Sequence, residues 1–161
     1  TGSGCIACAL AAERPDLDVV AVDVSPAAAA VARENVRALG LAARVRVVAA
    51  DLFDGLHDLR ADLIVSNPPY LPSGLMPRLP PEVRIHEPRL ALDGGQDGLA
   101  VIRRIASAAR QYLRPAGALV VETAGGDQAS AAAALLRETG WNRVSVRPDL
   151  VGVARFVAGG A

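Results

Sequence analysis

Four consecutive residues, Asn67-Pro68-Pro69-Tyr70, have the types and the spacing that suit chemistry on a planar amino group. The two prolines fix the chain and lack backbone N–H groups, which leaves the carbonyl groups before them free to accept hydrogen bonds. The Asn67 side-chain oxygen and the Pro68 carbonyl can accept the two N–H bonds of an –NH2 group, while the Tyr70 ring packs over its π-plane. The alternative interpretation is a rigid proline-rich turn with no chemical role.

A second candidate site is the glycine turn Thr1-Gly2-Ser3-Gly4, which is followed by Asp23, 19 residues beyond Gly4. Glycines let a ligand approach the backbone closely, and a carboxylate at the next strand end can accept hydrogen bonds from ribose hydroxyls. Enzymes that bind NAD and enzymes that bind S-adenosylmethionine share this pattern. The turn therefore indicates a nucleotide cofactor without deciding which one.

The residues that follow favour S-adenosylmethionine. Asp51, followed by the apolar Leu52, can accept the exocyclic amine of adenine while apolar side chains sandwich the ring. Methyl transfer from a sulfonium moves positive charge to the attacked nitrogen, so acceptors around that nitrogen stabilise the transition state most. We therefore expect Asn67, Pro68 and Tyr70 to be catalytic, with no metal ion and no dedicated general base.

The elements that must position these residues alternate between strand and helix. Period-2 and β-branched patterns predict strands, and period-3.6 patterns with caps predict helices. The strands are expected over residues 18–24, 44–50, 61–66, 117–123, 143–147 and 153–158, and the helices over 5–12, 25–39, 97–113 and 128–139. This order predicts an α/β fold with a mostly parallel sheet covered on both faces and a C-terminal antiparallel hairpin.

Two stretches of the chain lie outside this regular alternation. The glycine turn opens the chain with no strand before it, so we expect the first strand of the sheet to be absent. Residues 67–96 form a long segment rich in proline and glycine, and segments of this kind in compact domains are often functional.

Composition narrows the class of protein. Hydrophobic residues make up 52% of the 161 residues and charged residues 21%, which excludes a disordered chain. No apolar run approaches the roughly 18 residues of a membrane span. The 17 basic and 17 acidic side chains balance, which argues against a protein that mainly grips nucleic acid. Two cysteines and no signal peptide indicate a cytoplasmic protein.

Several longer motifs carry a resemblance to a known family. They are T-G-S-G (1–4), A-V-D-V-S-P (21–26), A-D-L-F (50–53), S-N-P-P-Y (66–70), E-V-R-x-H-E-P-R-L-A-L-D-G-G-x-D-G-L (82–99) and D-L-x-G-x-x-R (149–155). On these motifs the chain resembles the release-factor glutamine N5-methyltransferases, the HemK/PrmC family, over essentially all 161 residues. The motif N-P-P-Y also occurs in adenine-N6 DNA methyltransferases, whereas E-P-R-L-A-L-D-G-G points to this family.

The resemblance implies a Rossmann-like class I methyltransferase sheet, with residues 1–161 as the catalytic domain and a small N-terminal helical docking domain absent. It implies S-adenosylmethionine as methyl donor, S-adenosylhomocysteine as product, and the Gly-Gly-Gln glutamine of class 1 peptide-chain release factors as acceptor. No nucleic-acid partner, no membrane and a monomer are expected.

The resemblance also implies roles for single residues. Those expected to contact the cofactor are Thr1, Gly2, Ser3 and Gly4 (methionine part), Asp23 (ribose), Asp51 and Leu52 (adenine), and Asn67. Asn67, Pro68, Pro69 and Tyr70 would bind the target glutamine. In one place the chain departs from the family, because the run from Glu122 to Gln128 is one residue longer than the family pattern.

Three alternatives to methylation of a release factor stay open at this point. They are a ribosomal protein bearing the target glutamine, adenine in DNA or RNA, and a binding module without catalysis. Charge balance weighs against a nucleic acid, and the intact residues 67–70 weigh against a module without catalysis.

Overall fold

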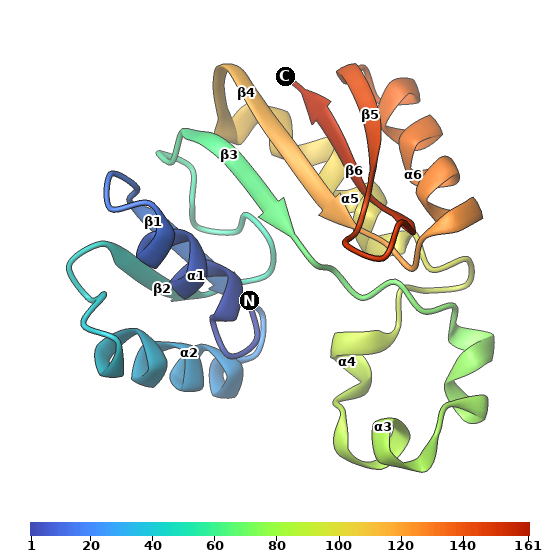
Figure 1. Ribbon diagram of the computed structural model, residues 1–161, viewed down its shortest axis with the longest axis horizontal. Coiled ribbons are helices and arrows are strands. Elements are labelled where there is room, and N and C mark those ends of the chain that lie inside the picture. The colour runs from blue at the N-terminus through green and yellow to red at the C-terminus, as the bar shows by residue number, and fades with distance from the viewer. The chain divides into compact units, whose positions relative to one another are not determined.

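The computed structural model describes all residues, 1–161, and the chain divides into two compact units, residues 1–57 and 58–161. The first unit comprises α1 (Cys5–Glu13), β1 (Val19–Asp23), α2 (Pro26–Ala38) and β2 (Val45–Ala49) (Figure 1). The two strands pair in parallel, with Val19 opposite Val45 and Asp23 opposite Ala49. Both strands therefore end at the same edge of this small sheet.

Local sequence explains the helix boundaries of the first unit. Ser25 precedes α2, and its hydroxyl accepts a hydrogen bond from the Ala28 N–H at 3.3 Å, while Pro26 occupies the first turn. Gly40 follows the helix in the left-handed region, with φ of 69°. Small side chains, including Ala11 and Val36, form the buried core between the helices and the strands.

The second unit contains a four-stranded sheet in the order β3-β4-β6-β5. Its elements are β3 (Ala61–Ser66), η1 (Ser73–Arg78), α3 (Pro81–His86), α4 (Arg89–Leu92), α5 (Ala100–Ala108), η2 (Ala109–Tyr112), β4 (Leu113–Glu122), α6 (Gly126–Glu138), β5 (Asn142–Pro148) and β6 (Ala154–Gly160). β3 and β4 are parallel, whereas β6 runs antiparallel to both β4 and β5. The parallel pairs and the C-terminal antiparallel hairpin confirm the predicted fold class.

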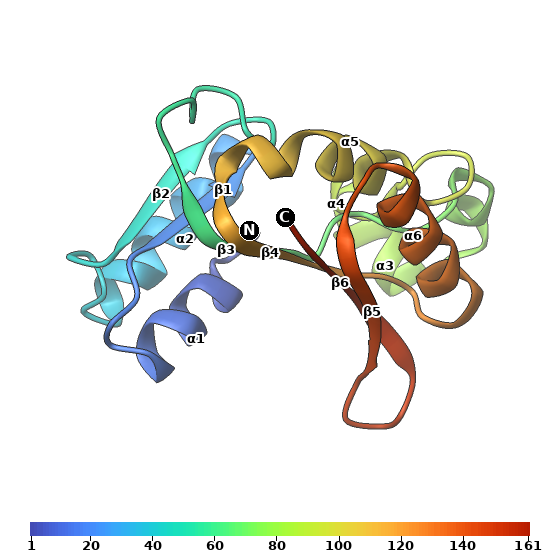
Figure 2. The same ribbon diagram turned by 90° about the horizontal axis from the view of Figure 1, so that it is seen from above.

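A well-packed core holds this second sheet to its helices. Ile102 and Ile105 of α5 and Leu136 of α6 are fully buried, as is Val121 of β4. The Trp141 indole N–H also donates a buried hydrogen bond to the Ala106 carbonyl, at 2.9 Å. Both views place α6 beside β5 and β6 (Figures 1 and 2). The strand that leads into residues 67–70, β3, pairs with β4 of this sheet.

Two details differ from the sequence prediction. The helix expected to reach Leu113 ends at Ala108, because Leu113 instead pairs with Ala61 as the start of β4. The segment 71–96 is not wholly irregular, since it contains η1, α3 and α4, none of which has a buried residue.

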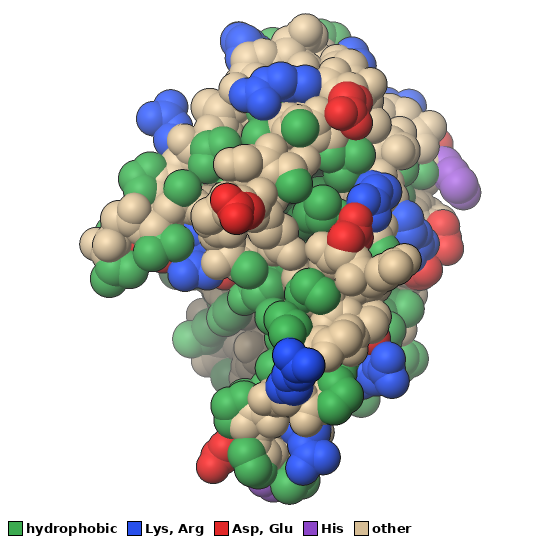
Figure 3. Space-filling model, turned by 90° about the vertical axis from the view of Figure 1, so that its right-hand side faces the viewer, with side chains coloured by type: hydrophobic (Ala, Val, Ile, Leu, Met, Phe, Trp, Pro, Cys, Tyr) green, Lys and Arg blue, Asp and Glu red, His purple; other side chains and the backbone are tan.

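The surface carries no charge patch of a single sign on the face in Figure 3, where acidic and basic side chains are interspersed among apolar ones. None of the helices combines the length and the apolar character needed to cross a lipid bilayer.

Candidate active site

The glycine turn, residues 1–4, is tied to the end of β1 by the carboxylate of Asp23. The Gly2 N–H donates to Asp23 Oδ2 at 2.7 Å, and the Ser25 N–H donates to Oδ1 at 2.8 Å. The Thr1 nitrogen also donates to Oδ2, at 2.7 Å. The structure therefore brings Thr1, Gly2 and Asp23 into direct contact.

The Asp23 carboxylate keeps room for a further partner. Partial burial raises the pKa of the Asp23 carboxyl, but the hydrogen bond and charge of the terminal ammonium of Thr1, together with the hydrogen bonds from the Gly2 and Ser25 N–H groups, outweigh it and hold the pKa below its ordinary value. The group is thus ionised at neutral pH. A carboxylate offers about four acceptor positions, and the three donors leave one for a ribose hydroxyl.

Gly2 and Gly4 are required as glycines for different structural reasons. Gly4 has φ of 81°, and a Cβ there would lie 3.1 Å from the Ala32 Cβ of α2, so this glycine permits close packing of turn and helix. Gly2 has φ of 56°, and nothing lies within 4 Å of the position that its Cβ would take. Between them, the Ser3 carbonyl accepts a hydrogen bond from Asn35 at 2.9 Å. Gly2 therefore borders open space in which a ligand could approach the backbone.

Asp51 and Leu52 follow β2 at the same sheet edge as Asp23. The Ala50 N–H donates to the Asp23 carbonyl at 2.9 Å, which holds the start of this segment beside the end of β1. Leu52 has φ of 52°, in the left-handed region that a non-glycine residue seldom adopts. Strained residues of this kind occur often at ligand-binding sites, so Leu52 is consistent with an adenine-binding position.

The acceptor loop, residues 67–70, leaves the sheet directly after Ser66, the last residue of β3. Pro68 is buried, Pro69 and Tyr70 are half-buried, and Asn67 is exposed. Neither the Asn67 side chain nor the Pro68 carbonyl forms a hydrogen bond within the protein. Two acceptors suited to an –NH2 group are therefore free.

The long motif of residues 82–99 lies against the backbone that follows Tyr70. Leu71 and Asp93 form an isolated parallel bridge, in which the Leu71 N–H donates to the Leu92 carbonyl at 2.9 Å and the Gly94 N–H to the Leu71 carbonyl at 2.8 Å. This pairing attaches the motif to the residue directly after the acceptor loop.

Asp93 stabilises that attachment. Its carboxylate accepts hydrogen bonds from the Ser73 hydroxyl at 2.6 Å, from the Gly95 N–H at 3.0 Å and from the Arg89 guanidinium at 2.8 and 2.9 Å. These donors, Ser73 first, lower the pKa of Asp93 to about 2. The acidic residue of the motif is therefore a structural anchor.

The candidate residues divide between the two units. Those expected to contact the cofactor, apart from Asn67, belong to the first unit, and residues 67–70 belong to the second. The sequence analysis missed Gly98 and Gln128 as parts of the site, although both approach the Tyr70 carbonyl. The altered spacing between Glu122 and Gln128 was the available signal.

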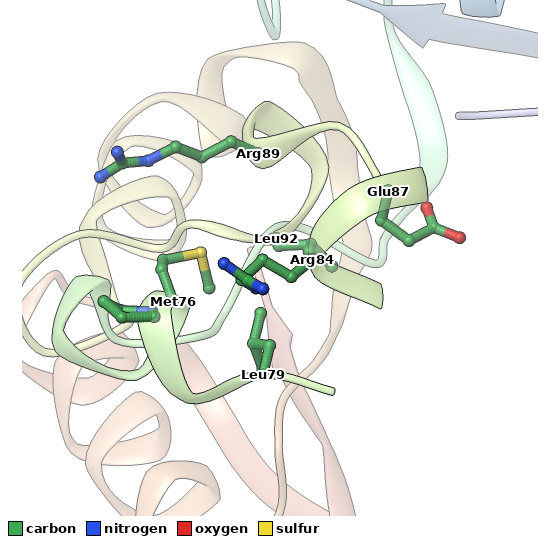
Figure 4. A pocket seen from close by; sticks show the side chains of 7 residues that line it. Met76, Leu79, Arg84, Glu87, Arg89 and Leu92 are labelled. Carbon is green, nitrogen blue, oxygen red and sulfur yellow. The ribbon is translucent and has the colours of Figure 1, made fainter. Parts of the chain in front are cut away.

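An open pocket of about 260 Å³ lies within the segment 71–96 and includes none of the predicted site residues. Figure 4 shows the Met76 and Leu79 side chains close to the Arg84 guanidinium, while the Glu87 and Arg89 side chains point away. The lining residues are Met76, Pro77, Leu79, Arg84, Glu87, Arg89 and Leu92. The pocket is thus apart from the acceptor loop and belongs to the segment that follows it.

Comparison with known proteins supports a methyltransferase. Residues 1–75 match the family described as "Methyltransferase small domain". A crystal structure of a methyltransferase from Pyrococcus furiosus has a TM-score of 0.74 at 18% identity, covering 99% of this chain and 71% of that one. This likeness to a methyltransferase structure confirms the predicted fold.

Curated proteins give a more specific likeness. The chain is 50% identical over 158 residues to a release factor glutamine methyltransferase of Cereibacter sphaeroides, covering 98% of this chain and 56% of that protein. It is also 50% identical over 122 residues to a ribosomal protein uL3 glutamine methyltransferase of Bradyrhizobium diazoefficiens, covering 76% and 38%. The chain spans about half the length of the first of these proteins.

Proposed function

We propose that the chain is the catalytic part of a release factor glutamine methyltransferase, which transfers a methyl group from S-adenosylmethionine to the side-chain amide nitrogen of a protein glutamine; the 50% identity over 158 residues to such a protein supports this. The proposed acceptor is the glutamine of the Gly-Gly-Gln loop in class 1 release factors. We further propose that the protein acts as a monomer in the cytoplasm, where such acceptors occur.

The first unit suits the cofactor. Asp23 would accept a hydrogen bond from a ribose hydroxyl at its remaining acceptor position, and the open space beside Gly2 suits the methionine part. Asp51 and Leu52, at the same sheet edge, would hold the adenine. When bound, S-adenosylmethionine supplies an electrophilic methyl group attached to a positively charged sulfur.

The second unit suits the acceptor. Asn67 Oδ1 and the Pro68 carbonyl would each accept one N–H of the glutamine amide, which aims the nitrogen lone pair at the methyl carbon. Held in this way, the nitrogen would take the methyl group from the sulfur, leaving S-adenosylhomocysteine, and would then give up a proton to solvent. Because positive charge develops on that nitrogen, the two acceptors stabilise the transition state more than the ground state. Tyr70 would pack against the amide plane.

One observation carries this proposal. Two oxygens that could accept an amide, on Asn67 and Pro68, stay free of protein partners although the surrounding backbone is extensively hydrogen-bonded. Buried polar groups in folded proteins usually have partners, so the free carbonyl of the buried Pro68, next to the exposed Asn67 amide, is suited to a ligand.

The test is methylation of candidate acceptors by the full-length protein. Labelled S-adenosylmethionine is incubated in parallel with a release factor, with ribosomal protein uL3 and with unmethylated DNA, and peptides are mapped by mass spectrometry. We expect one methyl group on the glutamine of Gly-Gly-Gln. Labelling of DNA with both proteins unmodified would overturn the proposal.

Ribosomal protein uL3 is the second candidate acceptor. The likeness to the uL3 methyltransferase of Bradyrhizobium diazoefficiens, 50% over 122 residues, favours including it. A higher kcat/KM for uL3 than for the release factor would assign the chain to that acceptor.

A further inference from the structure

We propose that Gln128 is a positioning residue for the acceptor loop, acting through the Tyr70 carbonyl. This inference rests on the proposed function and adds to it a residue that does not touch the acceptor. Gln128 Nε2 donates to the Tyr70 carbonyl at 2.8 Å, and Gln128 Oε1 accepts from the Ala124 N–H at 2.8 Å. Both ends of one amide thus join the acceptor loop to the loop that follows β4.

The contact between Gln128 and Tyr70 is tightly enclosed by glycine backbone. A Cβ on Gly98 would lie 2.5 Å from Gln128 Nε2 and closer still to the Tyr70 carbonyl oxygen. A Cβ on Gly94 would lie 2.8 Å from the Pro69 carbonyl oxygen. Because a side chain at Gly98 would clash with Gln128 and Tyr70, glycine at this position lets the Gln128 bond form, and Gly94 lets the backbone approach Pro69.

The other end of the Gln128 bridge is fixed by Arg155. The Arg155 guanidinium donates to the Ala124 carbonyl at 3.0 Å and to the Asp149 carboxylate at 2.9 Å. Thr123, fully buried, donates through its N–H to the Arg155 carbonyl at 3.0 Å and through its hydroxyl at 2.8 Å. The motif of residues 149–155 therefore holds the loop to which Gln128 is bonded.

The extra residue between Glu122 and Gln128 does not break this connection. Gly125 and Gly126 have φ of 95° and 55°, in a region that glycine adopts without strain. The lengthened loop turns there, and α6 begins at Gly126 with Gln128 in its first turn. The side chain is thereby placed to reach Tyr70.

The consequence for the reaction is a fixed direction for the acceptor loop. Gln128 binds the Tyr70 carbonyl and leaves the Asn67 and Pro68 oxygens free. Loss of this bond would let the loop shift, and a displacement of about 1 Å at a reacting centre can lower a rate about a hundredfold. We expect cofactor affinity to stay unchanged, because the Gln128 side chain bonds to Tyr70 and Ala124, neither of which is assigned to the cofactor.

The experiment compares Gln128→Glu with Gln111→Glu in the full-length protein, since Gln111 is exposed and makes no side-chain hydrogen bond. At about pH 8 we expect Gln128→Glu to lower kcat about tenfold to a hundredfold with KM for S-adenosylmethionine unchanged. As pH falls, the introduced carboxyl takes up a proton and can donate to Tyr70 again, so kcat relative to wild type should rise. Gln111→Glu should match wild type throughout.

A kcat ratio that stays the same at every pH, or an unchanged kcat, would overturn the positioning role. Amide exchange of Ala124 gives a second readout that needs no activity. Gln128→Met keeps the side-chain length without the hydrogen bonds and should speed exchange at Ala124, whereas unchanged exchange would contradict the bridge. If wild type methylates no acceptor but exchange responds, the proposed function fails and the bridge stands.

Discussion

Asn67 is the residue on which the proposed chemistry depends most directly. It is exposed, it follows the last residue of β3, and its amide makes no hydrogen bond within the protein. A side chain with no structural partner can be removed at little cost in stability. Its substitution therefore separates catalysis from folding.

We expect Asn67→Ala to lower turnover on the order of 100-fold, by analogy with the loss of one hydrogen-bonding group that acts on the transition state. Binding of S-adenosylmethionine should be largely retained. Steady-state kinetics and calorimetry measure the two effects. Asn142→Ala, at another exposed asparagine without a side-chain hydrogen bond, is the control. A raised KM with unchanged kcat would make Asn67 a ground-state binding residue.

Asp23 has two roles in this structure, because it also holds the backbone of Gly2 and Ser25. We expect Asp23→Ala to weaken S-adenosylmethionine binding about tenfold to a hundredfold, since a charge-assisted hydrogen bond contributes roughly 1.5–3 kcal/mol. Calorimetry measures the affinity, and NAD should give no comparable heat. Asp16→Asn, in an exposed pair with Arg14, should leave the affinity unchanged. An unaltered affinity in Asp23→Ala would remove the ribose assignment.

At the level of elements, the motif of residues 82–99 stabilises the segment beside the acceptor loop. Burial of its apolar side chains does not provide this stability, because Ile85 and Leu90 are 67% and 62% exposed. Hydrogen bonds instead hold the segment, and many of them converge on Asp93. The local stability of this segment should therefore depend on the charge of one carboxylate.

This dependence has a defined pH window. Asp93 has a pKa of about 2 in the folded protein, against about 3.9 for an unfolded chain. A lowered folded pKa gives stability that is complete above the unfolded value and is lost as pH falls through about 2. We expect the stability difference between wild type and Asp93→Asn to shrink between about pH 5 and about pH 2. Urea unfolding at several pH values measures it.

The control for that series is Asp58→Asn, because the Asp58 side chain is exposed and makes no hydrogen bond. Its stability should track that of wild type at each pH. A difference for Asp93→Asn that is constant from about pH 5 to about pH 2 would show that the carboxylate charge does not hold the segment.

At the scale of the whole molecule, charge balance predicts how the acceptor is bound. The formal net charge is zero, and acidic and basic side chains intermingle on the face in Figure 3. A protein acceptor should therefore be methylated at a rate that depends only weakly on salt. A nucleic acid held by six or more phosphates would lose roughly 10³-fold in affinity between about 50 and 200 mM salt.

Methyl transfer to a release factor and to unmethylated DNA across one salt series measures this difference. Efficient DNA labelling at low salt that disappears at high salt, with the release factor untouched, would favour adenine as the acceptor. If the rate of methyl transfer to the release factor fell steeply with salt, charge would contribute strongly to its docking and the prediction would be wrong.

Much of the secondary structure follows from the sequence by itself, because the information is local. Period-2 runs and the Ser25-Pro26 cap predict β1 and α2 closely, and the strand end before Asn67 lies at Ser66. The two prolines after Asn67 constrain the backbone of residues 67–70 and lack N–H groups, so the chemical character of the acceptor loop follows from four consecutive residues. A local pattern of this kind specifies residue types, strand ends and turns.

Only the tertiary structure decides which oxygens of the acceptor loop are free and which are held. Tyr70 and Gln128 are 58 residues apart, and no period or cap in the sequence links them. Leu113 likewise fits the apolar stripe of a helix, yet pairing with β3 places it in a strand. Such outcomes depend on hydrogen bonds and packing between segments that are distant in the sequence. These interactions override local preference, because strands and carbonyl groups need hydrogen-bond partners and the tertiary fold determines which partners are near.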